Sequence, residues 1–453
     1  MKEYTVSRKS RMGKKSKGPV GTAIATHKRS PSTPPPTTGG SGMNEPKYEV
    51  AVRFDDLQGD LYSPFYSVKR FEDLGLSKDL LEGIYFMNFK KPSMIQERAL
   101  PLLLSNPPRN MIGQSQSGTG KTAALVLTML TRIDMSVSNV EALCLAPTRE
   151  LAKQIQRVVQ TMGQFTNVKA QFAIPNMAKC SQRIDAHIVV GTPGTVLDLI
   201  QRNQLAVEHL KLFMLDEVDN MLELQGLGEQ CLRVKRNIPS TTQIALFSAT
   251  CSDEAFKYMY RFAPNANRII LKNTEPSLAG IKQLCMDCQS EEDKYRVLLE
   301  LYHVLTVGSS IIFAKKRETT SEIQRRIEVD EHKVATLHSA QDRPDRDKAV
   351  HSFLSGKAKV LITTDVLVRG IDVATVSMVV NYDLPLDMNR QPDPVAYLHR
   401  VGRTGIFGRP GLSVNFVYDK HSLHQVTEIS SYFGTCMTRV STNNTDVCSF
   451  QTC

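Results

Sequence analysis

The sequence of 453 residues has no long apolar run and no regular spacing of cysteines. No stretch approaches the ~18 uninterrupted apolar residues of a membrane-spanning helix. The first residues also lack the apolar core of a secretory signal. The nine cysteines are an odd number without a framework, which predicts free thiols in a reducing compartment. Membrane-inserted and disulfide-stapled classes are therefore not expected.

The part of the chain that is expected to fold has little net charge. Residues 1–48 hold ten basic and two acidic residues, so they account for +8 of the formal net charge of +10. Residues 30–42 consist only of Ser, Pro, Thr and Gly and cannot build a core. Residues 1–48 are therefore predicted to be a disordered basic tail, which could serve solubility, nuclear targeting or non-specific RNA binding.

From about residue 70, short apolar runs alternate with helix-like segments, which predicts an α/β protein with parallel sheets covered on both faces. The predicted domains are 49–272 and 281–435, with a linker at 273–280 and an irregular tail at 436–453. The predicted strands lie within 110–113, 142–147, 186–191, 212–217 and 244–249 in the first domain, and within the runs IKQLCMDC, GSSIIFAK, HKVATLH, KVLITTD, VSMVVNYD and GLSVNFVY in the second.

A phosphate-binding loop is predicted between the first of these strands and the following helix. Glycines allow backbone N–H groups to curl around phosphates, a lysine reaches the β- and γ-phosphates, and a threonine hydroxyl can bind Mg²⁺. The pattern is relaxed only at its first position, where Ser115 replaces glycine. The predicted nucleotide ligands here are Ser117, Gly118, Thr119, Gly120, Lys121 and Thr122.

A second nucleotide element, Asp216-Glu217-Val218-Asp219, ends an apolar strand about a hundred residues after this loop. An acid at this place can hold Mg²⁺, which suits Asp216 together with Thr122. The neighbouring Glu217 can orient and deprotonate the attacking water. We therefore predict that Asp216, Glu217 and Lys121 are catalytic.

With these motifs, residues from about 60 to 435 resemble the DEAD-box RNA helicases, with Val218 where the family has alanine. The resemblance implies two tandem RecA-like domains and an ATP hydrolase that uses ATP and Mg²⁺. It also implies Phe89 and Gln96 as the residues that recognise adenine. The alternative of a P-loop ATPase that acts on DNA fits the second-domain motifs less well.

The resemblance further implies sequence-independent contacts to the RNA backbone. The implied RNA-binding residues are Pro147, Thr148, Arg149, Thr192, Pro193, Gly194, Arg317, Arg346, Thr363 and Thr364. The segment Ser248, Ala249 and Thr250 resembles the motif that couples ATP hydrolysis to unwinding. ATP and RNA together would favour domain closure, with local duplex melting or protein displacement as the result.

In the second domain, the resemblance implies that Gly370 and Asp372 contact the nucleotide and that Arg400 and Arg403 reach the γ-phosphate. Ile406 stands where the family carries a second arginine finger. Such a finger is worth about 10³–10⁵ in rate. The alternative function is therefore an ATP-dependent RNA clamp that hydrolyses ATP weakly or not at all.

Three segments are similar to the nuclear-pore branch of the family, which remodels messenger RNA during export: the residues around the phosphate loop, GTPGTVLD with Thr195, and the insertion MNRQPDP. This branch implies a nucleoporin and an inositol hexakisphosphate-bound export co-activator as partners. It also implies a monomer found in the cytoplasm and nucleus, including the cytoplasmic face of the nuclear pore. The C-terminal segment departs from the acidic helix of the branch.

Overall fold

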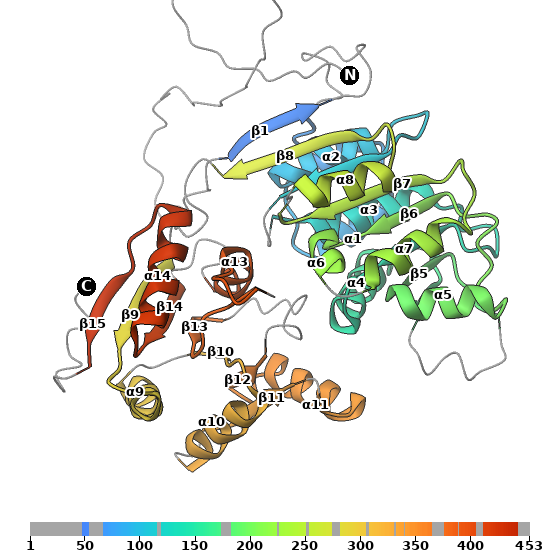
Figure 1. Ribbon diagram of the computed structural model, residues 1–453. Helices are drawn as coiled ribbons and strands as arrows, with labels where there is room; N and C mark the ends of the chain where they lie inside the picture. The colour runs from blue at the N-terminus through green and yellow to red at the C-terminus, as the bar shows by residue number, and fades with distance from the viewer. Residues whose placement is uncertain are drawn as a thin grey trace, which may run out of the picture. The chain divides into compact units, whose positions relative to one another are not determined.

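The computed structural model divides the chain into two compact units, with residues 47–274 in unit 1 and 275–453 in unit 2. It describes residues 48–53, 67–115, 119–173, 183–223, 226–250, 253–273, 281–304, 308–329, 332–338, 340–364, 376–387, 389–404 and 411–442. Each unit is an α/β layer structure built around one sheet (Figure 1). The predicted disordered tail 1–48 lies outside the described residues except for Tyr48.

Unit 1 contains an eight-stranded sheet in the order β1-β8-β2-β7-β6-β3-β5-β4. Only β1 runs antiparallel to its neighbour, β8. The strands are β1 Tyr48–Arg53, β2 Met111–Gln114, β3 Ala142–Leu145, β4 Ala170–Ala173, β5 Ile188–Gly191, β6 Leu212–Leu215, β7 Gln243–Ser248 and β8 Asn267–Asn273. The helices are α1 Lys78–Phe86, α2 Met94–Leu103, α3 Lys121–Arg132, α4 Arg149–Met162, α5 Pro193–Gln201, α6 Val218–Glu223, α7 Leu227–Lys235 and α8 Asp253–Phe262.

The central strands of unit 1 are apolar on both faces because helices cover both sides of the sheet. In β6, Leu212 and Met214 pack into one hydrophobic cluster, whereas Phe213 and Leu215 pack into another. Alternate side chains of a strand point to opposite faces, so a sheet that is covered twice requires a continuous apolar run. This is the physical reason why the sequence shows such runs without polar alternation.

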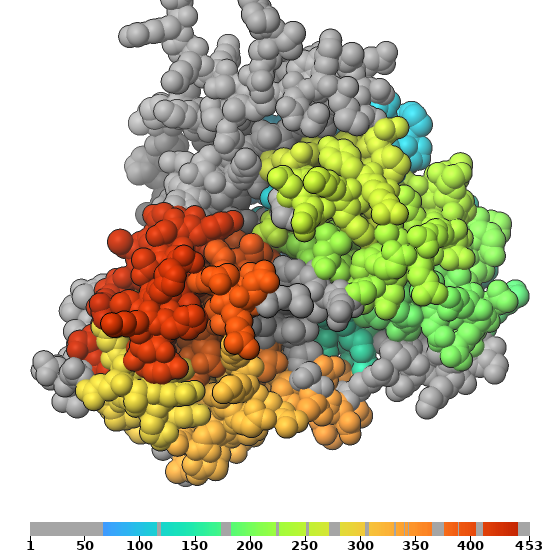
Figure 2. Space-filling model, viewed as in Figure 1, coloured from blue at the N-terminus to red at the C-terminus, as the bar shows by residue number. Residues whose placement is uncertain are grey.

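Unit 2 repeats the architecture with a seven-stranded sheet in the order β11-β12-β10-β13-β14-β9-β15. Its strands are β9 Ile281–Asp287, β10 Ser310–Phe313, β11 Val334–Leu337, β12 Val360–Thr363, β13 Met378–Asn381, β14 Gly411–Val417 and β15 Thr438–Ser441. Its helices are α9 Glu291–Val304, α10 Arg317–Val329, α11 Arg343–Leu354, α13 Pro394–Val401 and α14 Lys420–Phe433. In the space-filling view, the C-terminal elements of this unit form one closely packed red surface (Figure 2).

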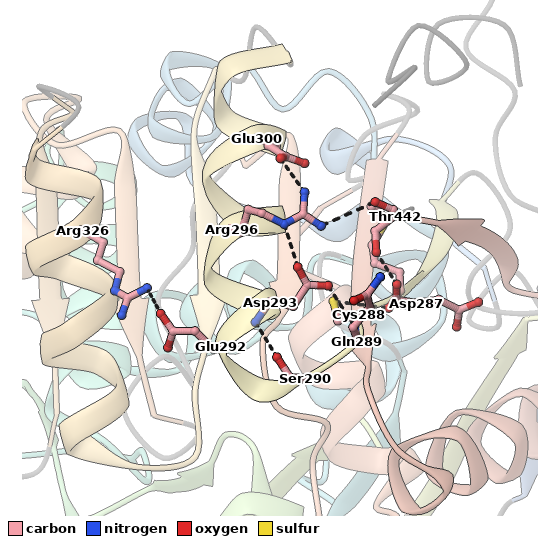
Figure 3. Close-up of polar contacts among 11 residues, drawn as sticks. Asp287, Cys288, Gln289, Ser290, Glu292, Asp293, Arg296, Glu300, Arg326 and Thr442 are labelled. Atoms are coloured by element: carbon pink, nitrogen blue, oxygen red, sulfur yellow. Dashed lines mark hydrogen bonds and ion pairs between the residues drawn. The ribbon is translucent and has the colours of Figure 1, made fainter. Parts of the chain in front are cut away.

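Polar side chains of α9 connect this helix to the C-terminal strand and to α10 (Figure 3). Arg296 donates to the carboxylate of Asp293 at 2.7 Å and to the carbonyl of Thr442 at 3.5 Å. Arg326 of α10 reaches Glu292 at 2.6 Å. Since these groups lie near the surface, each contact adds little stability.

The α/β fold and every predicted strand run are confirmed, because each run overlaps one strand. Two boundary predictions were wrong. Residues 438–441 are not irregular but form β15, which pairs in parallel with β9. Tyr48 and Asn273, assigned to the tail and to the linker, belong to strands that pair with each other. Both errors involve an edge strand, β15 or β1, that pairs with a segment far away in the sequence.

The remaining linker residues 274–280 and the C-terminal residues 443–453 lie outside the described residues. Within the part of the chain that the structure describes, no helix combines the length and apolarity that a membrane span needs.

Candidate nucleotide and RNA site

The functional motifs of unit 1 gather at the carboxyl edge of its parallel strands. Ser115 follows β2, Pro147 lies just after β3, Thr192 follows β5 and Asp216 follows β6, while Ser248 is the last residue of β7. The strands β2, β7, β6, β3 and β5 are consecutive in the sheet. Parallel strands present their carboxyl ends at one edge, which is where α/β folds bind ligands.

The phosphate loop is anchored to the sheet at its first residue. The backbone N–H of Ser115 donates to the carbonyl of Ser248 at 3.1 Å. The Ser115 and Thr119 hydroxyls are 2.8 Å apart. The buried ammonium of Lys121 donates to the carbonyl of Ser115, which closes the loop on itself. Ser117 and Gly118 lie outside the described residues.

Gln96 joins the predicted adenine motif to this loop. Its Nε2 donates to the carbonyl of Gly120 at 3.1 Å, and its Oε1 accepts from the backbone N–H of Ser93 at 2.9 Å. An amide has two donor hydrogens and two acceptor lone pairs, so Gln96 retains the capacity for one donor and one acceptor bond to adenine. Phe89 is half-buried and packs against the core, so its predicted role in stacking stays a prediction.

Replacing Gly120 by alanine is expected to weaken nucleotide binding by about tenfold. Gly120 has φ +98°, and an added Cβ would come within 2.6 Å of Gln96 Nε2 and 2.8 Å of Ser93 Oγ. The strain amounts to roughly 1–3 kcal/mol. Fluorescence titration with an ATP analogue measures the effect. Gly226→Ala, which has φ +84° but open space around it, is the matched control and should bind normally.

Asp216 is a buried carboxyl at the centre of the site. It is 1% exposed and accepts from the Thr122 hydroxyl at 3.2 Å and from the Glu217 backbone N–H at 3.0 Å. Burial, reinforced by the nearby charge of Glu217, raises the pKa of Asp216 to about 7, against the opposing effects of Lys121 and Thr122. Such a buried carboxyl oxygen next to a hydroxyl suits Mg²⁺. The positive charge of the ion would favour the ionised carboxylate over the protonated acid.

The two halves of the acidic motif serve different contacts. The carboxylate of Glu217 accepts from the Asn220 side chain at 2.7 Å. Asp219 instead faces the predicted coupling motif: its Oδ2 accepts from the backbone N–H of Ala249 at 3.2 Å, and from the backbone N–H and the hydroxyl of Thr250 at 2.8 and 2.9 Å.

Asp219 and Asn220 belong to the site but were not predicted from the sequence. The sequence contains a signal that could have identified Asp219, because this residue is the last of the acidic motif Asp216-Glu217-Val218-Asp219. Asn220 follows it directly but carries no pattern that sequence reasoning could have used. Val218, the departure from the family pattern, is fully buried in a hydrophobic cluster.

Three of the predicted RNA residues of unit 1, Pro147, Thr192 and Gly194, line one pocket of about 430 Å³. The pocket is lined by Pro147, Thr192, Gly194, Thr195, Asp198, Leu227 and Gln230. Thr148 and Thr192 are the N-cap residues of α4 and α5, and Thr148 Oγ1 accepts from the Leu151 N–H at 3.2 Å. Arg149 and Pro193 are the first residues of those helices. Gln230 was not predicted to belong here.

In unit 2, the predicted RNA residues lie on three elements: Arg317 begins α10, Arg346 lies in α11, and Thr363 ends β12 and is followed by Thr364. Burial, together with the charges of Arg317 and Arg346, lowers the pKa of His338, which follows β11. Thr363 pairs in register with Leu337, and its buried hydroxyl donates to the carbonyl of Thr364 at 2.9 Å. His338 was not among the residues predicted from the sequence.

The arginines predicted to reach a phosphate lie on and just after α13. Arg400 is buried, and its Nη1 donates to Asn381 Oδ1 at 3.0 Å and to the Asp383 carbonyl at 2.6 Å. Arg403 is half-buried, and its Nε donates to the His399 carbonyl at 3.1 Å. Their catalytic contacts stay predictions. Gly370, Asp372 and Ile406 lie outside the described residues.

Comparison with known proteins identifies the family. Residues 93–258 match the DEAD/DEAH box helicase family, and residues 293–408 match the helicase conserved C-terminal domain. The ATP-dependent RNA helicase dbp5 of Schizosaccharomyces pombe is 58% identical over 88% of this chain and 79% of its own length. The chain belongs to the DEAD/DEAH box helicases. The fold and enzyme class predicted from the sequence are thereby confirmed.

Solved structures give the same result for this DEAD-box protein. Saccharomyces cerevisiae Dbp5 bound to RNA and ADP BeF3 is 51% identical, with a TM-score of 0.80 over 85% of this chain and 98% of that one. A variant of S. cerevisiae Dbp5 bound to Nup159, Gle1, IP6 and ADP is also 51% identical, with a TM-score of 0.63 over 82% of this chain and 97% of that one. An ATP-hydrolysing RNA helicase is therefore favoured over the non-hydrolysing clamp.

Proposed function

We propose that this DEAD-box protein uses RNA-stimulated ATP hydrolysis to melt short RNA duplexes or displace bound proteins during the export of messenger RNA. The observation that carries the proposal is the contact of Asp219 with Thr250, which connects the acidic motif of the nucleotide site to the coupling motif. The similarity to Dbp5 supports the role in export.

The hydrolytic roles follow from the chemistry of the residues. Gln96 binds the adenine edge, and Lys121 neutralises charge on the β- and γ-phosphates. Glu217 accepts the proton of the attacking water. Thr122 and Asp216 would hold Mg²⁺, which supplies charge neutralisation between the phosphates when it is bound. Arg403 and Asp372 of unit 2 are proposed to complete the nucleotide contacts.

RNA is proposed to lie on the pocket of unit 1 and on the basic groups of unit 2. The pocket offers hydroxyls and a helix N-terminus, and unit 2 offers Arg317, Arg346, Thr363 and Thr364. These groups suit the sugar–phosphate backbone and carry no base-specific readout. Binding is therefore expected to be independent of base sequence, with a preference for RNA over DNA that a 2′-hydroxyl contact would provide.

The deciding experiment is steady-state ATP turnover with and without single-stranded RNA. We expect RNA to stimulate turnover, single-stranded DNA of the same sequence to stimulate it less, and Lys121→Ala to abolish it. Equal stimulation by RNA and DNA would favour a DNA-acting ATPase. Absence of turnover in a folded protein that still binds ATP and RNA would contradict the enzymatic function.

Ile406→Arg is expected to raise kcat at least tenfold with an unchanged KM for ATP. An arginine at this position restores a positive donor at a place where the family uses one, and a finger is worth about 10³–10⁵ in phosphoryl transfer. Measurement of kcat for both proteins under saturating RNA tests this prediction. If the unaltered chain does not hydrolyse ATP and only Ile406→Arg does, the clamp function is correct.

The similarity to Dbp5 in complex with Nup159, Gle1 and IP6 supports the same class of partners here: a nucleoporin and an inositol hexakisphosphate-bound co-activator. We propose accordingly that the protein acts as a monomer in the cytoplasm and nucleus, and at the cytoplasmic face of the nuclear pore. Fluorescence of the tagged full chain at the nuclear rim tests the location. A uniform signal that excludes the rim would contradict it.

A further inference from the structure

The carboxylate of Glu217 is held by a side chain to which the family resemblance assigned no role. Asn220 Nδ2 donates to Glu217 Oε2 at 2.7 Å. Asn220 is 2% exposed, on the first turn of α6, whereas Glu217 is half-buried just before that helix. A donor that is itself buried has few alternative positions, so the bond restricts where the carboxylate can lie.

Glu217 also has an unusual backbone conformation. Its φ is +54°, in the left-handed region that residues other than glycine seldom adopt. This conformation costs of order 1–3 kcal/mol and persists only where surrounding contacts determine it. The backbone N–H of Glu217 donates to Asp216 Oδ1 at 3.0 Å, and its carbonyl accepts from the N–H of Met221 at 3.2 Å. The backbone of this residue is thus fixed at both ends, and Asn220 fixes its side chain.

The contacts of Asn220 separate the catalytic group from the coupling group. Its side chain binds Glu217, whereas its backbone N–H donates to Asp219 Oδ1 at 3.1 Å. Asp219 in turn binds Thr250. A side-chain substitution therefore removes the contact with Glu217 and leaves the backbone contact that leads to the coupling motif.

We propose that Asn220 is a positioning residue for ATP hydrolysis, whose amide holds the Glu217 carboxylate where it can accept the proton of the attacking water. The proposal rests on the proposed function and deepens it. The position needs a neutral donor within reach of Glu217: aspartate would repel the carboxylate, and leucine of similar shape would leave it without this donor.

The test measures kcat, the KM for ATP and RNA affinity for Asn220→Leu, Asn220→Asp and Asn220→Gln. We expect kcat to fall at least tenfold for the first two, with KM and RNA affinity changed less than twofold. Asn220→Gln retains an amide donor, and its kcat should be at least a third of that of the unaltered protein. Asn237→Leu is the matched control, because the Asn237 amide donates at the surface to the Arg233 carbonyl, and it should behave like the unaltered protein.

A double-mutant comparison shows whether Asn220 acts through Glu217. In single-turnover experiments with Glu217→Gln, adding Asn220→Leu should change the residual rate less than twofold. A tenfold further loss there would overturn the proposal, as would an unchanged kcat in Asn220→Asp and Asn220→Leu. If the unaltered chain shows no RNA-stimulated turnover, the proposed function fails and this proposal fails with it. Turnover that is insensitive to Asn220 removes this proposal alone.

Discussion

Asp216→Asn is expected to abolish ATP turnover and at the same time to stabilise the nucleotide-free protein. The loss of turnover should be about a thousandfold, because the neutral amide is a poor ligand for Mg²⁺ and roughly 4 kcal/mol of charge stabilisation is lost. The gain in stability has a separate cause. The Asp216 carboxyl is buried beside Glu217, so its negative form is unfavourable in the folded state.

The sign of the pH dependence follows from the raised pKa. Asp216 titrates near pH 7 when folded and near pH 3.8, the ordinary value for an aspartate side chain, when unfolded, so the folded state binds the proton more tightly. Stability therefore falls as the pH rises between these values and becomes constant above about 7. One pKa unit corresponds to about 1.4 kcal/mol, so the advantage of Asp216→Asn should grow by about 2 kcal/mol between about pH 5.5 and pH 8.

Chemical denaturation in EDTA without nucleotide, at several pH values, measures this advantage. In asparagine, the amide oxygen at the Oδ1 position can still accept from the Glu217 N–H, and the amide NH2 at the Oδ2 position can donate to the Thr122 hydroxyl, so the variant should fold. Glu229→Gln, at an exposed ion pair with Arg236, is the control and should show no such pH-dependent gain. A stability difference that is constant with pH would contradict the protonated, buried state of Asp216.

Asp219→Ala is expected to lower stability by about 2–4 kcal/mol and to separate ATP hydrolysis from unwinding. The Asp219 carboxylate is the acceptor for the backbone N–H groups of Ala249 and Thr250, the Thr250 hydroxyl and the Asn220 N–H. Removing a buried acceptor leaves such donors unsatisfied at about 1–3 kcal/mol each, reduced where water reaches them. In a unit of this size, the melting temperature should fall by roughly 5–10 °C.

Unwinding should suffer more than hydrolysis. The contact of Asp219 with the Ser248–Thr250 segment is distinct from the contact of Glu217 with Asn220. Glu217, the group that activates water, therefore retains its hydrogen bond from Asn220 in this variant. We expect strand separation of a short RNA duplex to fall at least ten times more than kcat for ATP. The assay is run below the lowered melting temperature. A parallel fall of both activities would contradict a coupling role for Asp219.

Much of the fold was predictable from the sequence because the central strands carry their own signal. Runs such as 212–215 are apolar at every position, and a sheet covered on both faces is the arrangement that explains them. The edge strands gave no such signal. The side chains of β15 are mostly exposed, and its register comes only from pairing with β9, more than a hundred residues earlier in the chain.

The nucleotide loop, the acidic motif and the helicase family can be recognised from the sequence, because their chemistry requires particular residues at short spacings. Which of these residues contact each other depends on the tertiary structure. Asp219 meets Thr250 across 31 positions, and Asp216 meets Thr122 across 94. The protonation state of Asp216 and the positioning role of Asn220 both depend on burial. Burial arises from the packing of segments that are distant in the sequence.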